Sequence, residues 1–433
     1  MEQGQRAAVR RATCVALLCG TLSIFSWDAR AQAMRPDTQE VFDRFADRVV
    51  KIELIERESE AKAVIGSGFF VSASGNLITN YHVVSKLIHD PDDYTAQYVD
   101  AKGNEHPLDI LAVDVVHDLA VARTQQSVEA FLDLGNSEMA QGIRLYSLGY
   151  PHDIGITIVE GTYNGLLKHS LYGKIHFTGS LNPGMSGGPT IGAGGKVVGI
   201  NVSTAGNQVS FLVPVENASR LLRSVQAANY ETPKDFMVQL QQQLLDHQEV
   251  YFKEMLDREF ETVKLGNYEL PTQLAPFFKC WGDARREEDD PYEFVIHQCS
   301  SEDHVYISRG HRSGIVQMRH RLLTTNELNT IRFFSLYTKF FQGSYGHIAG
   351  EKEDVTRFRC NSEVVENNGV TVKAVLCVRR YRKLEGLYDV VLKAAVLGET
   401  DLGLETTLVL SGVSFANAEK LSKRYLETIA WSE

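Results

Sequence analysis

Basic residues are in short supply in this 433-residue chain, which has 44 Lys and Arg against 55 Asp and Glu and a formal net charge of −11. Binding to nucleic acid or to anionic lipid depends on a basic surface, so neither is an expected partner. Hydrophobic residues make up 43% of the chain and charged residues 23%, which excludes a disordered or fibrous protein. The length exceeds that of one ordinary domain, so we expect two or three domains.

Long apolar runs are absent beyond the first 33 residues. In those first 33 residues, Arg6, Arg10 and Arg11 precede an uncharged stretch over residues 12–27, and two small-x-small cleavage sites follow. This order predicts a cleavable signal peptide over residues 1–33. An uncleaved membrane anchor is the alternative, but the stretch is shorter than the about 20 residues that a spanning helix needs. We therefore expect an exported protein, periplasmic or secreted, with no stable membrane insertion after cleavage.

Cysteines are also few: outside the signal segment the chain has only Cys280, Cys299, Cys360 and Cys377. An even number of cysteines in an exported protein indicates disulfides, for which three connectivities are possible. Zinc binding is the alternative, but the sequence has no C-x-x-C pair and no clustered histidines beside the cysteines, so no metal site is expected. All four cysteines lie in the C-terminal half, so the N-terminal half should fold without crosslinks.

The dipeptide Asn368-Gly369 favours one of these connectivities. It is a strong hairpin signal, because both residues of such a turn must accept a positive φ. Folding the chain about it places Cys360 directly opposite Cys377, where cross-strand Cβ atoms are about 4.5–5.5 Å apart and near the reach of a disulfide. Cys280 and Cys299 flank an acidic loop in the same nested way. The predicted disulfides are Cys360–Cys377 and Cys280–Cys299.

The pattern of apolar residues changes twice along the chain. Short apolar or alternating runs separated by Gly, Asn and Asp fill residues 49–215 and are typical of a sandwich or barrel. After Thr232-Pro233 the apolar residues recur at helical spacing, which predicts a linker helix over residues 231–264. Strand signals return from about residue 265, and a last helix is expected over about 417–430.

Three separated segments each supply one residue of a nucleophilic site, in the order His, Asp, Ser. His82 ends the second strand of GSGFFVSASGNLITNYHVV, Asp118 begins the apolar strand of VDVVHDLAVAR, and Ser186 lies in the glycine-rich loop SLNPGMSGGPT. A serine hydroxyl is a poor nucleophile until a base takes its proton, and histidine suits that task because its ordinary pKa is about 6.5. A carboxylate then fixes the imidazole tautomer. Each residue alone has an ordinary explanation, but together they predict a catalytic triad.

The loop around Ser186 also predicts an oxyanion hole. Its glycines at 184, 187 and 188 permit a backbone shape in which successive N–H groups point at one spot. We expect the segment Gly184, Met185 and Ser186 to hold the oxyanion that forms during acyl transfer, through the amides of Gly184 and Ser186.

These segments resemble the protease domain of the HtrA (high-temperature-requirement A) type serine peptidases, within the trypsin-like class. That domain characteristically reads G-S-G-F…T-N-x-H-V-V, D-x-A, L-G-x-P and N-P-G-N-S-G-G-P, where this chain has GSGFFVSASGNLITNYHVV, DLAV, LGYP and NPGMSGGP. The resemblance implies two six-stranded β-barrels, with His82 and Asp118 from the first and Ser186 from the second. Met185 replaces the usual asparagine, and the region beyond about residue 226 lacks the carboxylate-binding loop of a PDZ domain.

The expected fold is therefore mainly β. It comprises a chymotrypsin-like double β-barrel over residues 34–230, the linker helix over 231–264 and a disulfide-bearing α+β domain over 265–433. The resemblance also locates the primary specificity pocket, because in trypsin-like folds it is lined by the stretch before the nucleophile and by a strand after it.

In this chain those two stretches are residues 177–184 and 200–206. The candidate substrate-binding residues in them are Ser180, Leu181, Ile200 and Val202. Neither stretch contains a carboxylate, and an unpaired buried cation is very costly. We therefore predict cleavage after small or medium aliphatic residues rather than after Lys or Arg. The alternative is that some of these side chains pack in the barrel core and line no pocket.

The function predicted from these residues is hydrolysis of peptide bonds in protein or peptide substrates by a serine endopeptidase. The reaction passes through an acyl-enzyme and needs no metal or organic cofactor. Two alternatives stand beside it, because a fold never proves a function. One is a catalytically silent scaffold with the protease fold, and the other is a binding protein that acts through its C-terminal domain.

Overall fold

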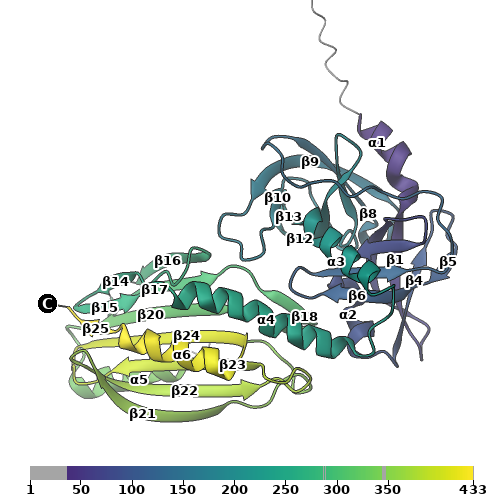
Figure 1. Cartoon of the computed structure of the whole chain (residues 1–433). Coiled ribbons are helices and arrows are strands. Elements are labelled where there is room, and N and C mark those ends of the chain that lie inside the picture. Colours follow the sequence, from purple (N-terminus) through teal and green to yellow (C-terminus); the bar gives the residue numbers. More distant parts are fainter. Residues whose placement is uncertain (1–36, 286, 288, 344–347, 433) are drawn as a thin grey trace, which may run out of the picture. The chain divides into compact units, whose positions relative to one another are not determined.

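The computed structural model describes residues 37–285, 287, 289–343 and 348–432, and Figure 1 shows them coloured along the chain. The predicted signal peptide over residues 1–33 lies outside the described residues. None of the helices in the described ranges combines the length and hydrophobicity that crossing a membrane requires.

The first sheet follows helix α1 (Thr38–Phe45) and has seven strands in the order β5-β4-β1-β2-β3-β7-β6. In chain order its elements are β1 (Val49–Glu56), β2 (Lys62–Phe70), β3 (Asn76–Thr79), α2 (Tyr81–His89), β4 (Tyr94–Val99), β5 (Glu105–Pro107), β6 (Asp109–Asp114) and β7 (Leu119–Arg123). The edge strands β5 and β6 are neighbours in the chain and meet at Leu108, whose N–H donates to the carbonyl of Ala96 (3.0 Å). Counted as one bent strand, they give this sheet six strands, the number that the resemblance implies for the first barrel.

The second sheet is a closed barrel in the order β10-β13-β12-β11-β8-β9. Its strands are β8 (Arg144–Gly149), β9 (Thr157–Leu166), β10 (Ile175–Phe177), β11 (Pro189–Gly192), β12 (Val197–Gly206) and β13 (Val209–Pro214), followed by helix α3 (Val215–Ala227). Phe69 and Ile78 of the first barrel lie in one apolar cluster with Tyr146 and Leu148 of the second. The expected double β-barrel is confirmed.

The predicted linker helix is α4 (Phe236–Leu256), shorter at both ends than the range 231–264. It begins after Asp235, whose side chain accepts hydrogen bonds from the N–H groups of Met237 and Val238 (2.8 and 3.4 Å). Such an N-cap satisfies amides that have no partner inside the helix, so it defines the start of the helix more sharply than the proline before it.

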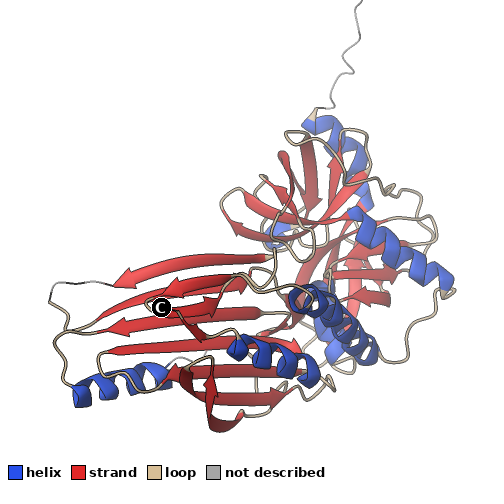
Figure 2. Cartoon of the chain, turned by 60° about the vertical axis from the view of Figure 1, so that its left-hand side comes forward, coloured by secondary structure: helices blue, strands red, loops and turns tan. Residues whose placement is uncertain are grey.

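The C-terminal half is built on a seven-stranded antiparallel sheet in the order β16-β17-β20-β24-β23-β22-β21. Its strands, seen side by side in Figure 2, are β16 (Phe278–Arg285), β17 (Glu293–Ser301), β20 (Val316–Thr324), β21 (Arg359–Asn367), β22 (Val370–Arg380), β23 (Tyr388–Val396) and β24 (Leu402–Val413). Two small sheets accompany it, formed by β14 (Thr262–Leu265), β15 (Tyr268–Pro271) and β25 (Ala430–Trp431), and by β18 (Val305–Ser308) and β19 (His311–Ser313).

Helices cover both faces of this large sheet. On one face lie α4 and α6 (Phe415–Glu427), as Figure 1 shows. Tyr251 of α4 and Leu421 of α6 form one apolar cluster with Met318 of β20. On the other face, Phe333 of α5 (Thr330–Gly343) packs beside Leu323. The C-terminal half is therefore an α+β structure, and its last helix begins two residues before the predicted position.

The C-terminal half packs on the first barrel through a shared apolar cluster. Tyr81 of α2 lies in that cluster with Leu240 of α4, Ile307 of β18 and Leu384. Gln243 of α4 adds polar contacts, since its side chain donates to the carbonyl of Val113 (2.7 Å) and accepts from the N–H of Val115 (2.8 Å). The first barrel and the C-terminal half therefore have a continuous core.

Both predicted disulfides are present. Cys360 lies directly opposite Cys377 in the register of β21 and β22, and Cys280 lies opposite Cys299 in β16 and β17. The hairpin between β21 and β22 turns at Asn368 and Gly369, whose φ values of 48° and 76° are those that this turn requires.

Replacing Cys360 and Cys377 together by serine is expected to lower the free energy of unfolding by about 2–4 kcal/mol, because the bridge restrains the unfolded chain. Replacing Cys280 and Cys299 should cost a similar amount, since the sequence separations of 17 and 19 residues are nearly equal. Urea unfolding of the oxidised proteins measures both losses. Reduction should destabilise the wild type but leave a variant without any of the four cysteines unchanged. A double-serine variant as stable as the wild type would contradict the prediction.

Candidate active site

His82 and Asp118 are brought together by the pairing of β3 with β7. The end of β3 lies beside the start of β7, with Thr79 opposite Ala120, so the residues just beyond these strand ends are neighbours. His82 lies in the first turn of α2, not at the end of a strand as the sequence indicated. Asp118 immediately precedes β7 and has a positive φ of 55°.

The carboxylate of Asp118 holds His82 by two hydrogen bonds. Its Oδ2 lies 2.6 Å from Nδ1 of the imidazole, and its Oδ1 accepts from the backbone N–H of His82 (2.8 Å). Asn80 also donates from its side chain to the carbonyl of Asp118 (2.7 Å). A neutral imidazole that donates from Nδ1 keeps its lone pair on Nε2, which is the tautomer that a general base needs.

The environment also sets the proton affinity of His82. Burial lowers the pKa of the imidazole, but the charge of Asp118 and the hydrogen bond to it act in the opposite direction. The net result is a pKa above the ordinary value for histidine. The imidazolium that forms when His82 accepts a proton is therefore stabilised in this site.

Two glycines give the loop of Ser186 its shape. Gly184 has a φ of 97°, and a Cβ there would lie 2.3 Å from the carbonyl oxygen of Tyr150. Gly187 has a φ of 85°, and its Cβ would lie 2.2 Å from the carbonyl oxygen of Ser67. Only glycine tolerates this combination of positive φ and close backbone approach, so the loop packs tightly against Tyr150, just after β8, and Ser67 of β2.

Two buried polar residues hold this loop, and neither was singled out from the sequence. Ser67 donates its backbone N–H to the carbonyl of Ser186 (2.8 Å) and its hydroxyl to the carbonyl of Gly184 (2.7 Å). Asn201 donates to the carbonyl of Met185 (3.2 Å), and its Oδ1 accepts two hydroxyl hydrogen bonds. Both are fully buried. The signal for Asn201 was a lone polar residue in the apolar run KVVGINVS.

The Ser186 hydroxyl contacts the carbonyl of Val202 at 3.5 Å. Among the described residues it makes no hydrogen bond to His82. The structure therefore joins His82 to Asp118 by hydrogen bonds, but it does not join Ser186, the third predicted member of the triad, to His82. Such bonds are often long or unformed in the absence of substrate.

The three amides of the predicted oxyanion segment differ in their partners. The N–H of Met185 donates to the carbonyl of Asn182 (3.0 Å) and so closes a turn. The N–H groups of Gly184 and Ser186 have no acceptor among the residues that the structure describes. These two amides are the ones available to a ligand.

The four candidate substrate-binding residues are placed differently from one another. Val202 lines a cavity of about 680 Å³ together with His82 and Asp118. Ile200 and Leu181 are buried in apolar clusters of the barrels, as the alternative interpretation proposed, and Ser180 is exposed.

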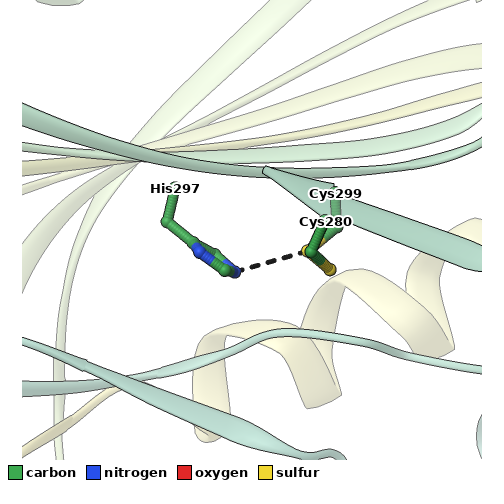
Figure 3. A group of neighbouring side chains, drawn as sticks. All are labelled: Cys280, His297 and Cys299. Carbon is green, nitrogen blue, oxygen red and sulfur yellow. Dashed lines mark hydrogen bonds between the residues drawn. A yellow bond between two sulfur atoms is a disulfide. The ribbon is translucent and has the colours of Figure 1, made fainter. Parts of the chain in front are cut away.

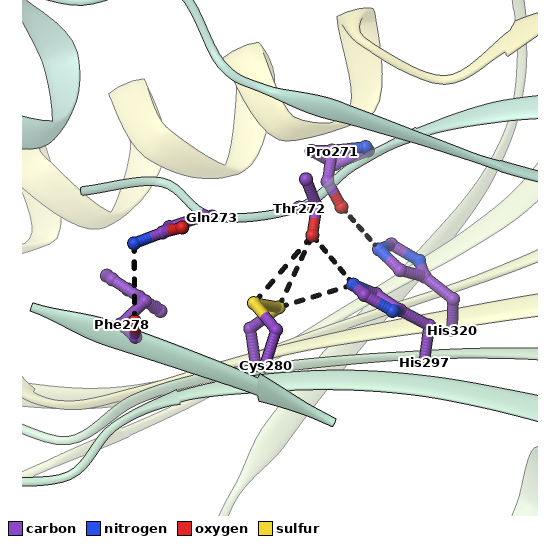
Figure 4. Close-up of a disulfide and its surroundings, with 8 residues drawn as sticks. Pro271, Thr272, Gln273, Phe278, Cys280, His297 and His320 are labelled. Atoms are coloured by element: carbon purple, nitrogen blue, oxygen red, sulfur yellow. Dashed lines mark hydrogen bonds between the residues drawn. A yellow bond between two sulfur atoms is a disulfide. The ribbon is translucent and has the colours of Figure 1, made fainter. Parts of the chain in front are cut away.

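Cys280, His297 and Cys299 form the one cluster of potential metal ligands found in the described ranges, with ligand atoms within 4.8 Å of one another (Figure 3). The two sulfurs are joined as a disulfide and carry no thiolate charge, whereas cysteine binds a metal ion as its thiolate. The Nε2 of His297 is also hydrogen-bonded to the hydroxyl of Thr272 at 2.7 Å (Figure 4). These residues therefore do not fit a metal site while the disulfide is intact.

The comparisons with known proteins concern the double barrel. Residues 66–200 match the trypsin-like peptidase domain family, a range that holds His82, Asp118 and Ser186. A probable periplasmic serine endoprotease, DegP-like, from Chlamydia trachomatis is 31% identical over 184 residues, which are 39% of this chain and 35% of that protein. Serine protease HTRA1 of Xenopus tropicalis is 28% identical over 197 residues, 42% of each chain.

Among solved structures, the crystal structure of Deg5 matches with 26% identity and a TM-score of 0.38, covering 43% of this chain and 92% of that one. The resemblance to trypsin-like serine peptidases of the HtrA type is thus confirmed for the double barrel. The chain spans only about a third to two fifths of the length of the two curated relatives named above.

Proposed function

We propose that this protein is a serine endopeptidase that cleaves exported or misfolded proteins, with His82, Asp118 and Ser186 as its triad. The observation that carries the proposal is the paired bonding of Asp118 to the imidazole Nδ1 and the backbone N–H of His82, beside the loop of Ser186. Serine endoproteases among the relatives support the same reaction. The relatives named as periplasmic support an exported location, periplasmic or secreted.

In this mechanism the Ser186 hydroxyl, turned from Val202 toward His82, attacks the scissile carbonyl carbon while its proton passes to Nε2 of His82. The carbonyl oxygen becomes an oxyanion that accepts hydrogen bonds from the amides of Gly184 and Ser186. His82 then gives the proton to the leaving nitrogen, the peptide C–N bond breaks and an ester on Ser186 remains. Water attacks that ester by the same sequence of proton transfers and regenerates the hydroxyl.

A fluorophosphonate probe tests the proposal, because it phosphonylates only an activated serine. The wild type should be labelled once and Ser186→Ala not at all. Ser127→Ala, which removes an exposed serine shortly after β7 and outside the candidate site, is the matched control and should be labelled like the wild type. If the wild type is not labelled, the proposed enzyme activity is refuted.

A catalytically silent scaffold is the second candidate. The contact of the Ser186 hydroxyl with the Val202 carbonyl, in place of His82, is the observation that favours it. A scaffold would bind unfolded proteins without labelling and without cleaving casein, so the same probe experiment separates the two functions.

The substrate preference is expected to be aliphatic. Val202 lines the cavity beside His82, and the stretches 177–184 and 200–206 contain no carboxylate to pair with a substrate cation. Glu302 and Asp303 also line the cavity, but each is already paired with a lysine. Cleavage should follow Val, Ala or Leu, with modest discrimination among them, since one methylene is worth about 1–3 kcal/mol. Mass spectrometry of a digested peptide library measures the preference. Dominant cleavage after Lys or Arg would show that another residue supplies the pocket.

A further inference from the structure

The hairpin of β18 and β19, from the C-terminal half, packs directly on the helix that carries His82. The hydroxyl of Tyr81, the residue before His82, donates to the carbonyl of Ile307 (2.7 Å), and His89 at the end of α2 lies 3.0 Å from the same oxygen. Tyr81 and Ile307 are both fully buried. The hairpin is therefore held in a defined position against α2.

Tyr306 of this hairpin reaches the candidate catalytic histidine. Its ring meets the imidazole of His82 edge to face, with 5.9 Å between the ring centroids and 70° between the ring planes. Its hydroxyl lies 3.5 Å from that of Ser85, one turn further along α2. Tyr306 is half-buried and lines the cavity beside His82, so an incoming group can reach it.

The segment before the hairpin is fixed to the second barrel. The carboxylate of Asp303 accepts hydrogen bonds from the hydroxyl of Ser170 (2.7 Å) and the N–H of Leu171 (2.8 Å). It also pairs with the ammonium group of Lys174 (2.9 Å). Residues 302–306 are thus bound to both barrels and span from one to the other.

The cavity beside His82 borders both this segment and β12. Its lining includes Val202–Ala205 and Glu302–Tyr306, together with residues 115–118 and 167–170. Beyond Asn201, β12 pairs only with β13, and no second strand of the described chain occupies its other edge. A free strand edge can pair with an extended peptide.

We propose that residues 302–306 form a wall of the substrate cleft and that Tyr306 is a specificity-determining residue supplied by the C-terminal half. The inference rests on the proposed endopeptidase function. A substrate strand paired with residues 202–205 brings its scissile residue to Ser186 and Val202. The residue preceding it in the substrate then lies between β12 and the ring of Tyr306, where an apolar side chain fits best.

The segment narrows the cleft and does not fill it. The cavity that both this segment and β12 line has a volume of about 680 Å³, and His82 and Asp118 line it as well. An aromatic ring is rigid and offers a large apolar surface at small entropic cost, so it suits a wall that selects one side chain.

The test compares peptides that differ only at the residue before the scissile one. The wild type should cleave the Leu or Val peptide at least about 10-fold faster in kcat/KM than the Gly peptide. Tyr306→Ala should reduce that ratio to about 2 or less, whereas Tyr306→Phe should retain it. Tyr306→Trp keeps a ring and narrows the cleft, so its preference should move toward Ala. Tyr388→Ala, a half-buried tyrosine on β23 that packs against Phe415, is the control and should keep the wild-type ratio.

Two outcomes would overturn the inference while leaving the enzyme function in place. If Tyr306→Ala and Tyr306→Trp slow all peptides equally and leave the ratio of kcat/KM between peptides unchanged, Tyr306 only positions His82 and does not determine specificity. An equal acceleration of all peptides would make the segment an obstruction. If the wild type does not react with fluorophosphonate, the proposed endopeptidase function itself is refuted.

Discussion

Replacing Ser186 by alanine is expected to lower peptidase turnover by about 10⁴-fold or more while the protein remains folded. In the proposed mechanism this hydroxyl forms the acyl-enzyme, and an alanine side chain has no nucleophile to replace it. Ser186 is partly exposed and its hydroxyl makes one long contact, so its removal leaves no buried group without a partner. Hydrolysis of casein or of an aliphatic peptide, together with a urea unfolding curve, measures activity and folding separately.

His82→Ala should cause a loss of similar size, because the hydroxyl is not activated without its base. The two changes are not expected to add: the double variant should be about as slow as either single variant, since both remove the same chemical step. Multiplicative losses would show that the two residues act in separate steps. Retention of most activity in Ser186→Ala would refute the proposed nucleophile.

The local parts of this structure were predictable because they depend on short stretches of sequence. Asn368-Gly369 allows only a few turn geometries, and the turn fixes the register that joins Cys360 to Cys377. The glycines beside Ser186 similarly indicate a backbone conformation that other residues cannot adopt. The spacing of apolar residues identified α4, though the N-cap that sets its start is a finer signal than periodicity.

The substrate side of the site was less predictable, because it depends on contacts between distant segments. Tyr306 and Ser85 are 221 residues apart, and no local pattern connects them. Strand alternation places Ile200 and Val202 on one face, and both pack in the same apolar cluster, but Val202 is only partly buried and also lines the cavity. The pairing of β12 with β13 shifts register between Asn201 and Ser203, and such an irregularity re-aims side chains without a clear sequence signal.

Asp118→Asn is expected to lower kcat by about 10⁴-fold at neutral pH, because the amide favours the wrong imidazole tautomer and cannot stabilise the imidazolium. The variant should also change the pH profile. His82 must be neutral to act as a base, so activity is lost as the pH falls through its pKa. The charge and hydrogen bond of Asp118 hold that pKa above its ordinary value, so the acid limb of wild-type kcat/KM should lie above about pH 6.5.

In Asp118→Asn the two effects that raise the pKa of His82 are removed while burial, which lowers it, remains. The acid limb of the residual activity should therefore move to lower pH, and kcat/KM measured from pH 5 to 9 with an aliphatic peptide follows the shift. Asp114→Asn is the matched control: it removes the neighbouring carboxylate–histidine pair, in which Asp114 lies 2.7 Å from Nδ1 of His117, and should leave the limb where it is. A limb that stays in place in Asp118→Asn, or moves equally in both variants, would mean that Asp118 does not set the proton affinity of the catalytic base.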